Sequence, residues 1–267
     1  MRLLLVEDDP AIRRFVSLAL EDLAVELRTA GTLAEAQAEV AARAPELLLT
    51  DLTLPDGDGL SLLERARQEP QWLRDALLVV FSARVSAESR RRALALGAWR
   101  VLDKPVPLQT LADCVRDAQA LWRQRARPAA AATATAATAV AAPAPAAAPA
   151  GHAEAGDAAV QAAIAMHFGG QRELYDAFAA GSAGRLQADL AAGRDALARA
   201  EFQALYRTAH SLRTVMQLLG APAAAAAARH LELACASPGV AAPVVSALWA
   251  ALADQLGAWL ARPDHPS

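Results

Sequence analysis

The first 123 residues alternate short apolar runs with stretches of helical periodicity. Three runs, Leu3–Val6, Leu47–Leu49 and Leu77–Phe81, contain no polar position. Strands of this kind are typical of parallel sheets, because helices cover both faces of the sheet. Weaker strands are expected near Val25–Thr29 and Trp99–Leu102. The predicted helices lie near residues 10–22, 32–43, 59–68, 86–96 and 107–123. Five β–α repeats predict a doubly wound α/β domain over residues 1–123 with a five-stranded parallel sheet, of the flavodoxin-like type.

The second half of the chain shows helical periodicity only. Helices are expected near residues 158–168, 171–197, 201–219, 222–236 and 242–260. The clearest apolar stripe alternates steps of three and four residues, at Phe202, Leu205, Ala209, Leu212, Met216 and Leu219. One such stripe on each helix suits antiparallel packing. The pattern therefore predicts an all-α domain of the four-helix-bundle type over residues 157–262, followed by a tail at 263–267.

Residues 124–156 are rich in Ala, Pro and Thr and have no apolar periodicity. Pro143, Pro145 and Pro149 prevent a continuous helix, because proline lacks the amide hydrogen that a helix interior needs. We predict a semi-extended linker here. A partly helical alanine tract around residues 129–142 is the alternative.

Composition narrows the function classes. The net charge is −3 and the pI about 6.0, so the chain as a whole lacks the basic bias of a nucleic-acid-binding protein. No stretch resembles a membrane span, and the opening apolar run is too short for an export signal. The two cysteines are far apart, which favours free thiols in a reducing compartment. We therefore expect a cytoplasmic protein that neither inserts into membranes nor binds nucleic acid.

Polar residues follow the predicted strands of the first domain. Glu7 and Asp8 follow the first strand, Asp51 the third, Ser82 the fourth and Lys104 the fifth. Each alone could be a helix cap, a turn residue or a solvated side chain. Together they are hard to explain as caps, since carboxylates at one edge of a parallel sheet repel each other. Mg²⁺ offsets such repulsion, because it prefers oxygen ligands and combines one or two carboxylates with phosphate oxygens.

An aspartate at such an edge can act as a nucleophile toward phosphorus and form an acyl phosphate. The transition state spreads negative charge over the phosphoryl oxygens, which need cations and hydrogen-bond donors placed in advance. Mg²⁺, the Lys104 ammonium and the Ser82 hydroxyl would supply these contacts.

Residues 1–123 resemble the receiver domain of bacterial two-component response regulators. The matching stretches are LLLVEDDPAIRR, LLLTDLTLPDGDGL, VVFSAR, ALALGA and VLDKPV. The resemblance implies that Asp51 is the phosphoacceptor and that Mg²⁺ is bound by Asp8, Asp51 and the Thr53 carbonyl, with Glu7 assisting through water. It also implies that Ser82 is the hydroxyl switch residue and that Lys104 pairs with phosphate and precedes a cis bond to Pro105. Val101 stands where the family usually has Tyr or Phe, which puts signalling by ring rotation in doubt but leaves the phosphorylation chemistry in place.

One histidine of the second domain has a suggestive setting. His210 shares a helix face with Tyr206, Arg213 and Gln217, at spacings of three and four residues. A neutral imidazole nitrogen can attack a phosphoryl group, and a nearby guanidinium would stabilise the anionic product. In isolation, however, a solvated helix face with an incidental histidine is the simpler explanation. His167, at a predicted helix end, is explained by a favourable helix-dipole interaction.

The stretch AHSLRTVMQLLGAPAAAAAARHLE resembles the histidine phosphotransfer (HPt) domain. His210, Leu212 and Arg213 match its signature, and a Gly-Ala pair follows at residues 220–221. The resemblance implies that His210 is a second phosphoacceptor. Thr214 replaces the glycine that keeps the approach to the histidine open, which predicts slower transfer or a narrower choice of partners.

The preferred interpretation is a phosphorelay protein rather than an enzyme with its own kinase activity, because no glycine-rich ATP-site motif is present. Asp51 would accept phosphate from a sensor histidine kinase, and His210 would exchange it with this or another receiver or HPt protein. The alternative is a binding module whose helical domain docks partners without phosphotransfer. A DNA-binding regulator is less favoured. The sequence does not determine the oligomeric state or the direction of phosphate flow.

Overall fold

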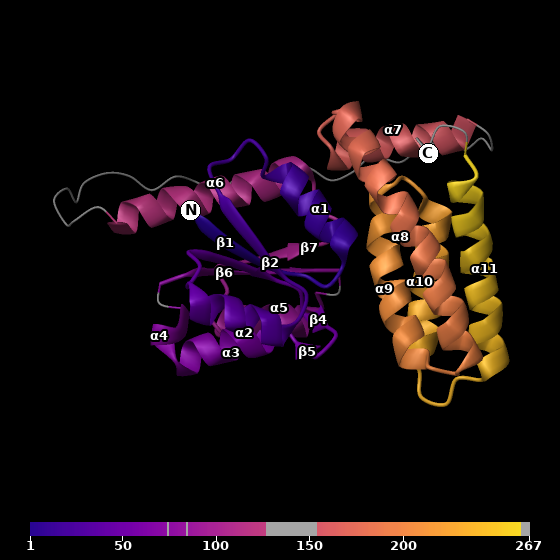
Figure 1. Ribbon diagram of the computed structural model, residues 1–267, viewed down its shortest axis with the longest axis horizontal. Helices are drawn as coiled ribbons and strands as arrows, with labels where there is room; N and C mark the ends of the chain where they lie inside the picture. Colours follow the sequence, from indigo (N-terminus) through magenta and orange to yellow (C-terminus); the bar gives the residue numbers. More distant parts are fainter. Residues whose placement is uncertain (74, 84, 127–153, 263–267) are drawn as a thin grey trace.

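The computed structural model describes residues 1–73, 75–83, 85–126 and 154–262. They form an α/β part up to residue 126 and an all-helical part from residue 154 (Figure 1). Most of the predicted linker and all of the predicted tail lie outside the described residues. The helices that flank the gap begin and end a few residues inside the expected linker.

The α/β part is built on a five-stranded parallel sheet, as predicted. The strands are β1 (Arg2–Val6), β2 (Glu26–Ala30), β3 (Leu47–Thr50), β6 (Leu77–Ser82) and β7 (Arg100–Asp103). Their order in the sheet is β2-β1-β3-β6-β7, and each neighbouring pair is parallel. A small antiparallel hairpin of β4 (Thr53–Leu54) and β5 (Gly57–Asp58) follows β3 and was not expected.

Helices cover both faces of the sheet, which explains the uninterrupted apolar strands. One face carries α1 (Pro10–Ala19) and α6 (Leu108–Ala126); the other carries α2 (Leu33–Ala42), α3 (Leu60–Gln68), the short α4 (Pro70–Leu73) and α5 (Ala87–Ala95) (Figure 1). Successive strand residues point to opposite faces. Leu3 and Leu5 therefore join the core under α1 and α6, whereas Leu4 and Val6 join the core on the other face.

The start of α1 fixes the backbone next to the acidic cluster. The Asp9 side chain accepts hydrogen bonds from the amides of Ala11 and Ile12, and Pro10 occupies the first helical position. Both features favour helix initiation, because capping satisfies free amides and proline has the helical φ in advance. The helix thus begins only four residues after β1 ends.

The second part contains helices only, close to the predicted bounds. These are α7 (Glu154–His167), α8 (Arg172–Ala198), α9 (Phe202–Leu218), α10 (Pro222–Cys235) and α11 (Ala242–Leu260). Helix α9 packs on α8 and α10, and α11 packs on α10 and α8. Helix α7 lies across one end of these four and contacts α9 (Figure 1). None of the helices in the described ranges is long and apolar enough to cross a membrane.

Two glycines permit close packing within the helical part. Gly220, between α9 and α10, has a positive φ of 67°, and a Cβ there would lie 2.7 Å from the carbonyl oxygen of Ala159 in α7. Gly193 in α8 lies against the ring of Trp249 from α11. Larger residues at either position would require the neighbouring helix to move.

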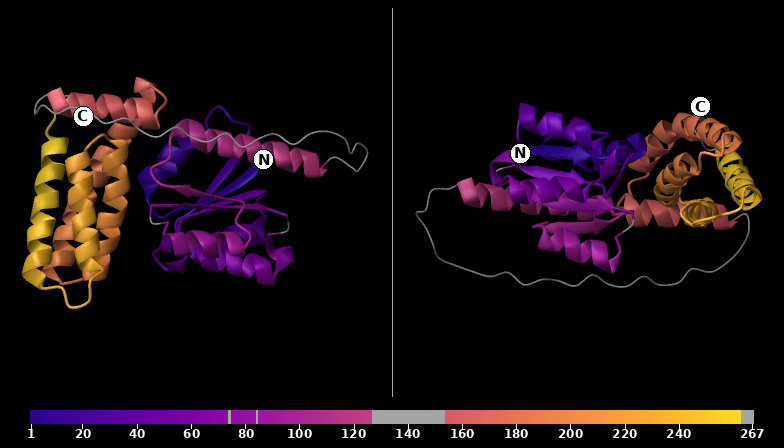
Figure 2. Two further views of the ribbon diagram at one scale, coloured as in Figure 1. Left: turned by 180° about the vertical axis from the view of Figure 1, so that it is seen from behind. Right: turned by 90° about the horizontal axis from the view of Figure 1, so that it is seen from below.

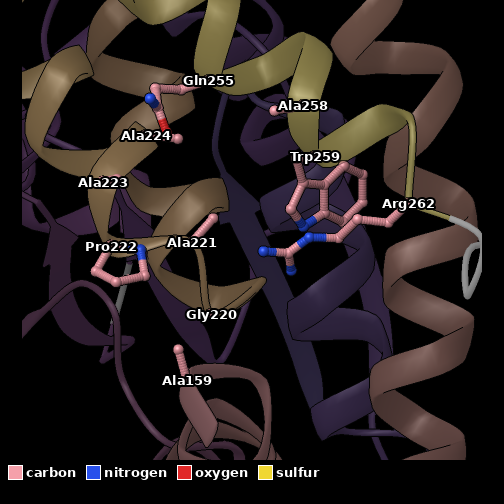
Figure 3. A pocket seen from close by; sticks show the side chains of 10 residues that line it. All are labelled: Ala159, Gly220, Ala221, Pro222, Ala223, Ala224, Gln255, Ala258, Trp259 and Arg262. Atoms are coloured by element: carbon pink, nitrogen blue, oxygen red, sulfur yellow. The ribbon is translucent and has the colours of Figure 1, made fainter. Parts of the chain in front are cut away.

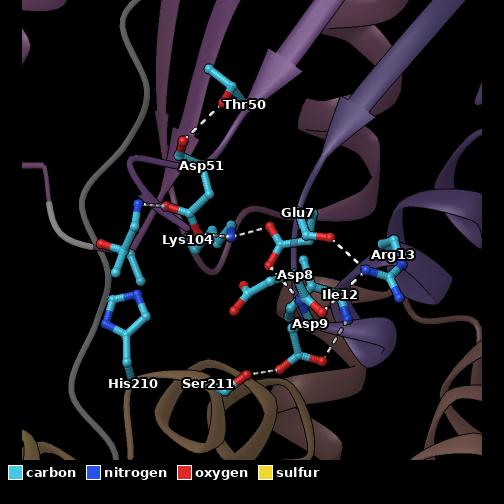
Figure 4. A network of polar contacts seen from close by, with 12 residues as sticks. Glu7, Asp8, Asp9, Ile12, Arg13, Thr50, Asp51, Lys104, His210 and Ser211 are labelled. Atoms are coloured by element: carbon cyan, nitrogen blue, oxygen red, sulfur yellow. Dashed lines mark hydrogen bonds and ion pairs between the residues drawn. The ribbon is translucent and has the colours of Figure 1, made fainter. Parts of the chain in front are cut away.

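The two parts are in contact through α1 and α8 (Figure 2). Buried side chains of α1 and α6 are continuous with those of the helical part in one hydrophobic cluster. This contact brings the amino-terminal end of α1, and with it the acidic cluster, next to α9 (Figure 4).

Candidate functional site

The sheet brings the predicted site residues together at the carboxyl ends of the strands. In the register, Val6 of β1 lies beside Thr50 of β3, which lies beside Val80 of β6. The residues that follow these strands therefore share one edge. Figure 4 shows Glu7, Asp8, Asp51 and Lys104 gathered there.

Lys104 connects the two most buried carboxylates of the cluster. Its ammonium donates to Oδ2 of Asp51 at 2.5 Å and to Oε2 of Glu7. The fractional exposure is 8% for Lys104, 2% for Asp51 and 1% for Glu7. The Lys104–Pro105 peptide bond is cis, as the resemblance implied. The ammonium also lies 4.8 Å from the centre of the Phe81 ring.

Burial and charge pairing set the protonation of this cluster. Burial disfavours ionisation of Asp51, but Lys104 outweighs it and holds the pKa of Asp51 below its usual range. Hydrogen bonds from the Ser82 side chain and from the Thr53 amide, at 3.1 Å, act in the same direction. Asp51 is therefore the ionised carboxylate of the cluster, as a nucleophile must be.

The pKa values of Glu7 and Lys104, by contrast, are both raised. Burial raises the pKa of Glu7 to about 8; Lys104 lowers it in part, and the charge of Asp51 raises it further. The pKa of Lys104 is raised, because Asp51 and Glu7 together outweigh the effect of burial. The lysine thus stays a cation at a fully buried position.

The oxygen-rich end of the cluster fits a hard cation in its chemistry. The pKa of Asp8 is raised by burial and by the charges of Asp51 and Asp9, so these carboxylates crowd one another beyond what Lys104 offsets. No group of three or more His, Cys, Asp or Glu side chains in the described residues is arranged to hold a metal ion. Lys104 lies between Glu7 and Asp51 in this arrangement.

Ser82 ends β6 and is fully buried beside Asp51, where it hydrogen-bonds to that carboxylate. Val101, which stands where the receiver family usually has Tyr or Phe, is half-buried in β7. The Arg90 guanidinium from α5 donates to the Val101 carbonyl at 3.3 Å and to Asp103 at 2.5 Å. Arg90 thus links α5 to β7, the strand that carries Val101 in place of the usual aromatic residue.

His210 lies on α9 and is 8% exposed. Its Nδ1 is 2.7 Å from Oε1 of Glu232 on α10, and its ring stacks on Tyr206 with centroids 6.2 Å apart. Its Nε2 is buried and has no hydrogen-bond partner among the described residues. A carboxylate at Nδ1 favours the tautomer with hydrogen on Nδ1, which leaves a lone pair on Nε2.

Glu232 was not singled out in the sequence, although it is 1% exposed and central to this arrangement. Oε2 of Glu232 also accepts from Nη1 of Arg213 at 2.8 Å. The sequence did contain a signal for this residue, because Glu232 falls on the apolar stripe of α10 with Ala225 and Ala228. An acidic residue on a core-facing stripe usually has a buried partner.

The neighbours of His210 contact the α/β part directly. The Ser211 hydroxyl donates to Oδ2 of Asp9, the residue that caps α1. Nη2 of Arg213 donates to the carbonyl oxygen of Ala83, one residue after β6, at 2.7 Å. His210 immediately precedes Ser211 in the sequence, and its ring points toward the carboxylate cluster (Figure 4).

His167 and the pocket of the helical part lie apart from this cluster. His167 was expected to interact with a helix dipole, but it is buried, and burial lowers its pKa to about 4. A pocket of about 260 Å³ between α10 and α11 is lined mainly by small residues with Trp259 and Arg262 (Figure 3). It contains none of the predicted site residues.

Residues 3–116 match the family model of the response regulator receiver domain. The relatives include the KDP operon transcriptional regulatory protein KdpE of Escherichia coli (strain K12), 39% identical over 43% of this chain and 49% of that protein. They also include the response regulator protein PilR of Pseudomonas aeruginosa, 35% identical over 47% of this chain and 28% of that protein. The chain thus spans about half or less of the length of these relatives.

Among solved structures, a CheY-like response regulator receiver domain protein from Methanospirillum hungatei JF-1 is 28% identical, with a TM-score of 0.43, over 46% of this chain and 97% of that one. The family match and the sequence relatives identify residues 3–116 as a receiver domain of two-component response regulators. The match ends before the helical part begins.

Proposed function

We propose that the chain is a phosphorelay protein in which Asp51 accepts phosphate from a phosphohistidine and His210 exchanges phosphate with a receiver. One observation carries the second half of this proposal. The free Nε2 of His210 is buried on the face of α9 that contacts the receiver, and a carboxylate orients the ring from behind. An incidental surface histidine has no need of such a partner.

Asp51 is suited to the first step because its pKa is held low while it is almost completely buried. The carboxylate oxygen attacks phosphorus, and the bond from phosphorus to the donor nitrogen breaks. Lys104 pairs with the phosphoryl oxygens, and Ser82 donates a hydrogen bond to them. Mg²⁺, held by Asp8, Asp51 and the Thr53 carbonyl, with Glu7 assisting through water, would supply neutralising charge.

In the second step the lone pair of Nε2 on neutral His210 attacks the phosphoryl group. The bond from phosphorus to the Asp51 oxygen breaks, and Asp51 leaves as a carboxylate paired with Lys104. The imidazole keeps its hydrogen on Nδ1 and becomes positively charged, and the Glu232 carboxylate offsets that charge at 2.7 Å. Arg213 holds Glu232 in place. The same groups serve the reverse step.

The helical part, with α8 to α11 packed side by side, is consistent with the bundle expected of an HPt domain. The partners expected on this proposal are a sensor histidine kinase and receiver or HPt proteins. A phosphorylation-controlled docking module is the second candidate. The direct contact of Arg213 with the Ala83 carbonyl favours it, because such a contact requires no phosphotransfer.

Phosphorylation by a purified sensor kinase or by acetyl phosphate distinguishes the two candidates. The wild type should carry an alkali-labile aspartyl label and an acid-labile histidyl label. If Asp51 supplies His210, Asp51→Asn loses both labels, whereas His210→Gln loses only the acid-labile one. An aspartyl label alone, with every phosphorylated receiver tried as donor to His210, would mean that the helical part is a docking module.

A further inference from the structure

An aromatic contact joins the receiver to the helical part. Phe15 of α1 is 1% exposed, and its ring meets Phe168 at 5.6 Å and Phe178 at 5.9 Å, both edge-on. Phe168 follows α7 and Phe178 belongs to α8, so the partners of Phe15 come from the other part of the chain. Edge-to-face geometry is the favoured arrangement of aromatic rings. Phe15 belongs to the buried stripe of α1 with Ile12 and Val16, and its ring contacts extend that stripe into the helical part.

Close packing of α1 and α8 continues beside this contact. Gly181 of α8 lies against the side chain of Arg14 of α1, so that a Cβ at Gly181 would be 3.1 Å from Cδ and Nε of the arginine. A larger residue at Gly181 would require the Arg14 side chain to shift.

Two polar contacts orient α9 over the phosphoacceptor. Ser211 donates to Asp9 beside the amino-terminal end of α1, and Arg213 donates to Ala83 beyond β6. Asp51 directly follows β3, the strand between β1 and β6, and is 2% exposed. The contacts therefore fall on either side of the strand that leads to Asp51, and His210 is the residue before Ser211 on α9. Figure 4 shows His210 and Ser211 of α9 next to the cluster that contains this carboxylate.

We propose that the chain's own helical part is the docked partner of the Asp51 site, held by Phe15, Ser211 and Arg213. Phosphate then passes between Asp51 and His210 within one chain, and an external donor reaches Asp51 only after the two parts separate. The transfer step rests on the proposed function above, but the restriction on external donors does not.

Docking makes two opposite predictions for one substitution. Ser211→Glu places a second carboxylate against Asp9, and the repulsion between the two weakens docking. Transfer from Asp51 to His210 should slow, because the docked fraction falls. Labelling of Asp51 by an external donor should become faster, because the site opens. A misfolded variant would lose both activities, so the opposite signs separate undocking from damage.

The first assay follows labelling of Asp51 by acetyl phosphate in full-length chains that carry His210→Gln, which isolates this step. We expect Ser211→Glu to increase the initial rate about tenfold, the effect of about 1.4 kcal/mol on the docking equilibrium. Phe15→Ala, made on the other side of the contact, should also increase it. Ser246→Glu is the matched control, because Ser246 is exposed and belongs to α11, a helix that lies away from the receiver (Figure 1). Equal rates in all four proteins would overturn the proposed restriction.

The second assay follows the appearance of the histidyl label in chains with both acceptors. Intramolecular transfer should be first order and independent of protein concentration over a hundredfold dilution. Two acceptors on one chain have an effective concentration in the ~mM range, so at about 10 μM protein the reaction in one chain should exceed that between His210→Gln and Asp51→Asn chains by ~100-fold. A rate that falls in proportion to dilution would overturn the intramolecular route.

Failure of the proposed relay and failure of the proposed internal docking would give different results. If no receiver ever labels His210, the proposed relay is wrong, and the first assay still decides whether the helical part restricts access to Asp51. If His210 is labelled between chains as fast as within one, the relay stands and internal docking is wrong.

Discussion

Glu232→Gln keeps the shape of the side chain but removes the charge that His210 and Arg213 share. The carboxylate accepts from Nδ1 of His210 at 2.7 Å and from Nη1 of Arg213 at 2.8 Å, and it is 1% exposed. A glutamine offers one oxygen and one NH₂ group in its place. If the oxygen stays with Arg213, the NH₂ group faces Nδ1 of His210, which must then become an acceptor.

That change moves the imidazole hydrogen to Nε2, the nitrogen proposed to attack phosphorus. Hydrogen bonds to charged groups contribute ~1.5–3 kcal/mol and neutral ones ~0.5–1.5 kcal/mol, so two such replacements should destabilise the helical part by about 2 kcal/mol. Loss of the negative charge beside the phosphorylated imidazole should slow transfer at least about tenfold, equivalent to about 1.4 kcal/mol in the barrier.

Denaturant unfolding measures the first effect, and single-turnover transfer to His210 the second. Glu173→Gln is the control, because Glu173 is an exposed glutamate in the first turn of α8 of the same part. A Glu232→Gln protein with reduced stability but a wild-type transfer rate would refute the orienting role of Glu232. Unchanged stability and rate together would refute the buried pairing itself.

Two further predictions concern the helical part. Gly193→Ala should destabilise it by ~1–3 kcal/mol in denaturant unfolding, because the new Cβ would lie 1.9 Å from the Trp249 ring. Gly184→Ala on the same helix, with open space around it, should instead stabilise by about 1 kcal/mol, and equal effects would contradict the packing. The pKa of His167 falls from 6.5 to about 4 by burial, so the unfolded chain binds the proton more readily and stability is lost as pH falls through this window. Acid titration of unfolding should show a loss of about 3 kcal/mol between pH 6.5 and 4 that His167→Asn lacks, and an identical pH profile for the two proteins would argue against burial of the neutral ring.

The sequence alone predicted most of the secondary structure. Uninterrupted apolar strands such as Leu3–Val6 require cover on both faces, and the parallel sheet with helices on each side follows from that requirement. The position of Asp51 and Lys104 after their strands placed them at one edge, where the structure pairs them at 2.5 Å. These predictions succeeded because periodicity and strand ends are local properties of the chain.

The sequence also located His210 on a helix face with Tyr206 and Arg213, since residues three and four apart on one helix are neighbours. It did not predict Glu232, which lies 22 residues away on another helix. The pairing depends on how α10 packs against α9, and helical periodicity does not specify which residues of two helices meet. The burial of His210, which the alternative of a solvated helix face does not explain, depends on the same packing.

Only the tertiary structure decided how the two parts meet. Phe15 was one apolar residue of α1 among several, and no local pattern connects it with Phe168 across the intervening linker. The contact between Ser211 and Asp9 joins a helix surface to a helix cap, two features that each have a sufficient local explanation. Local sequence thus pointed to both proposed acceptors, whereas their placement against each other depends on complementary surfaces that form only when both parts have folded.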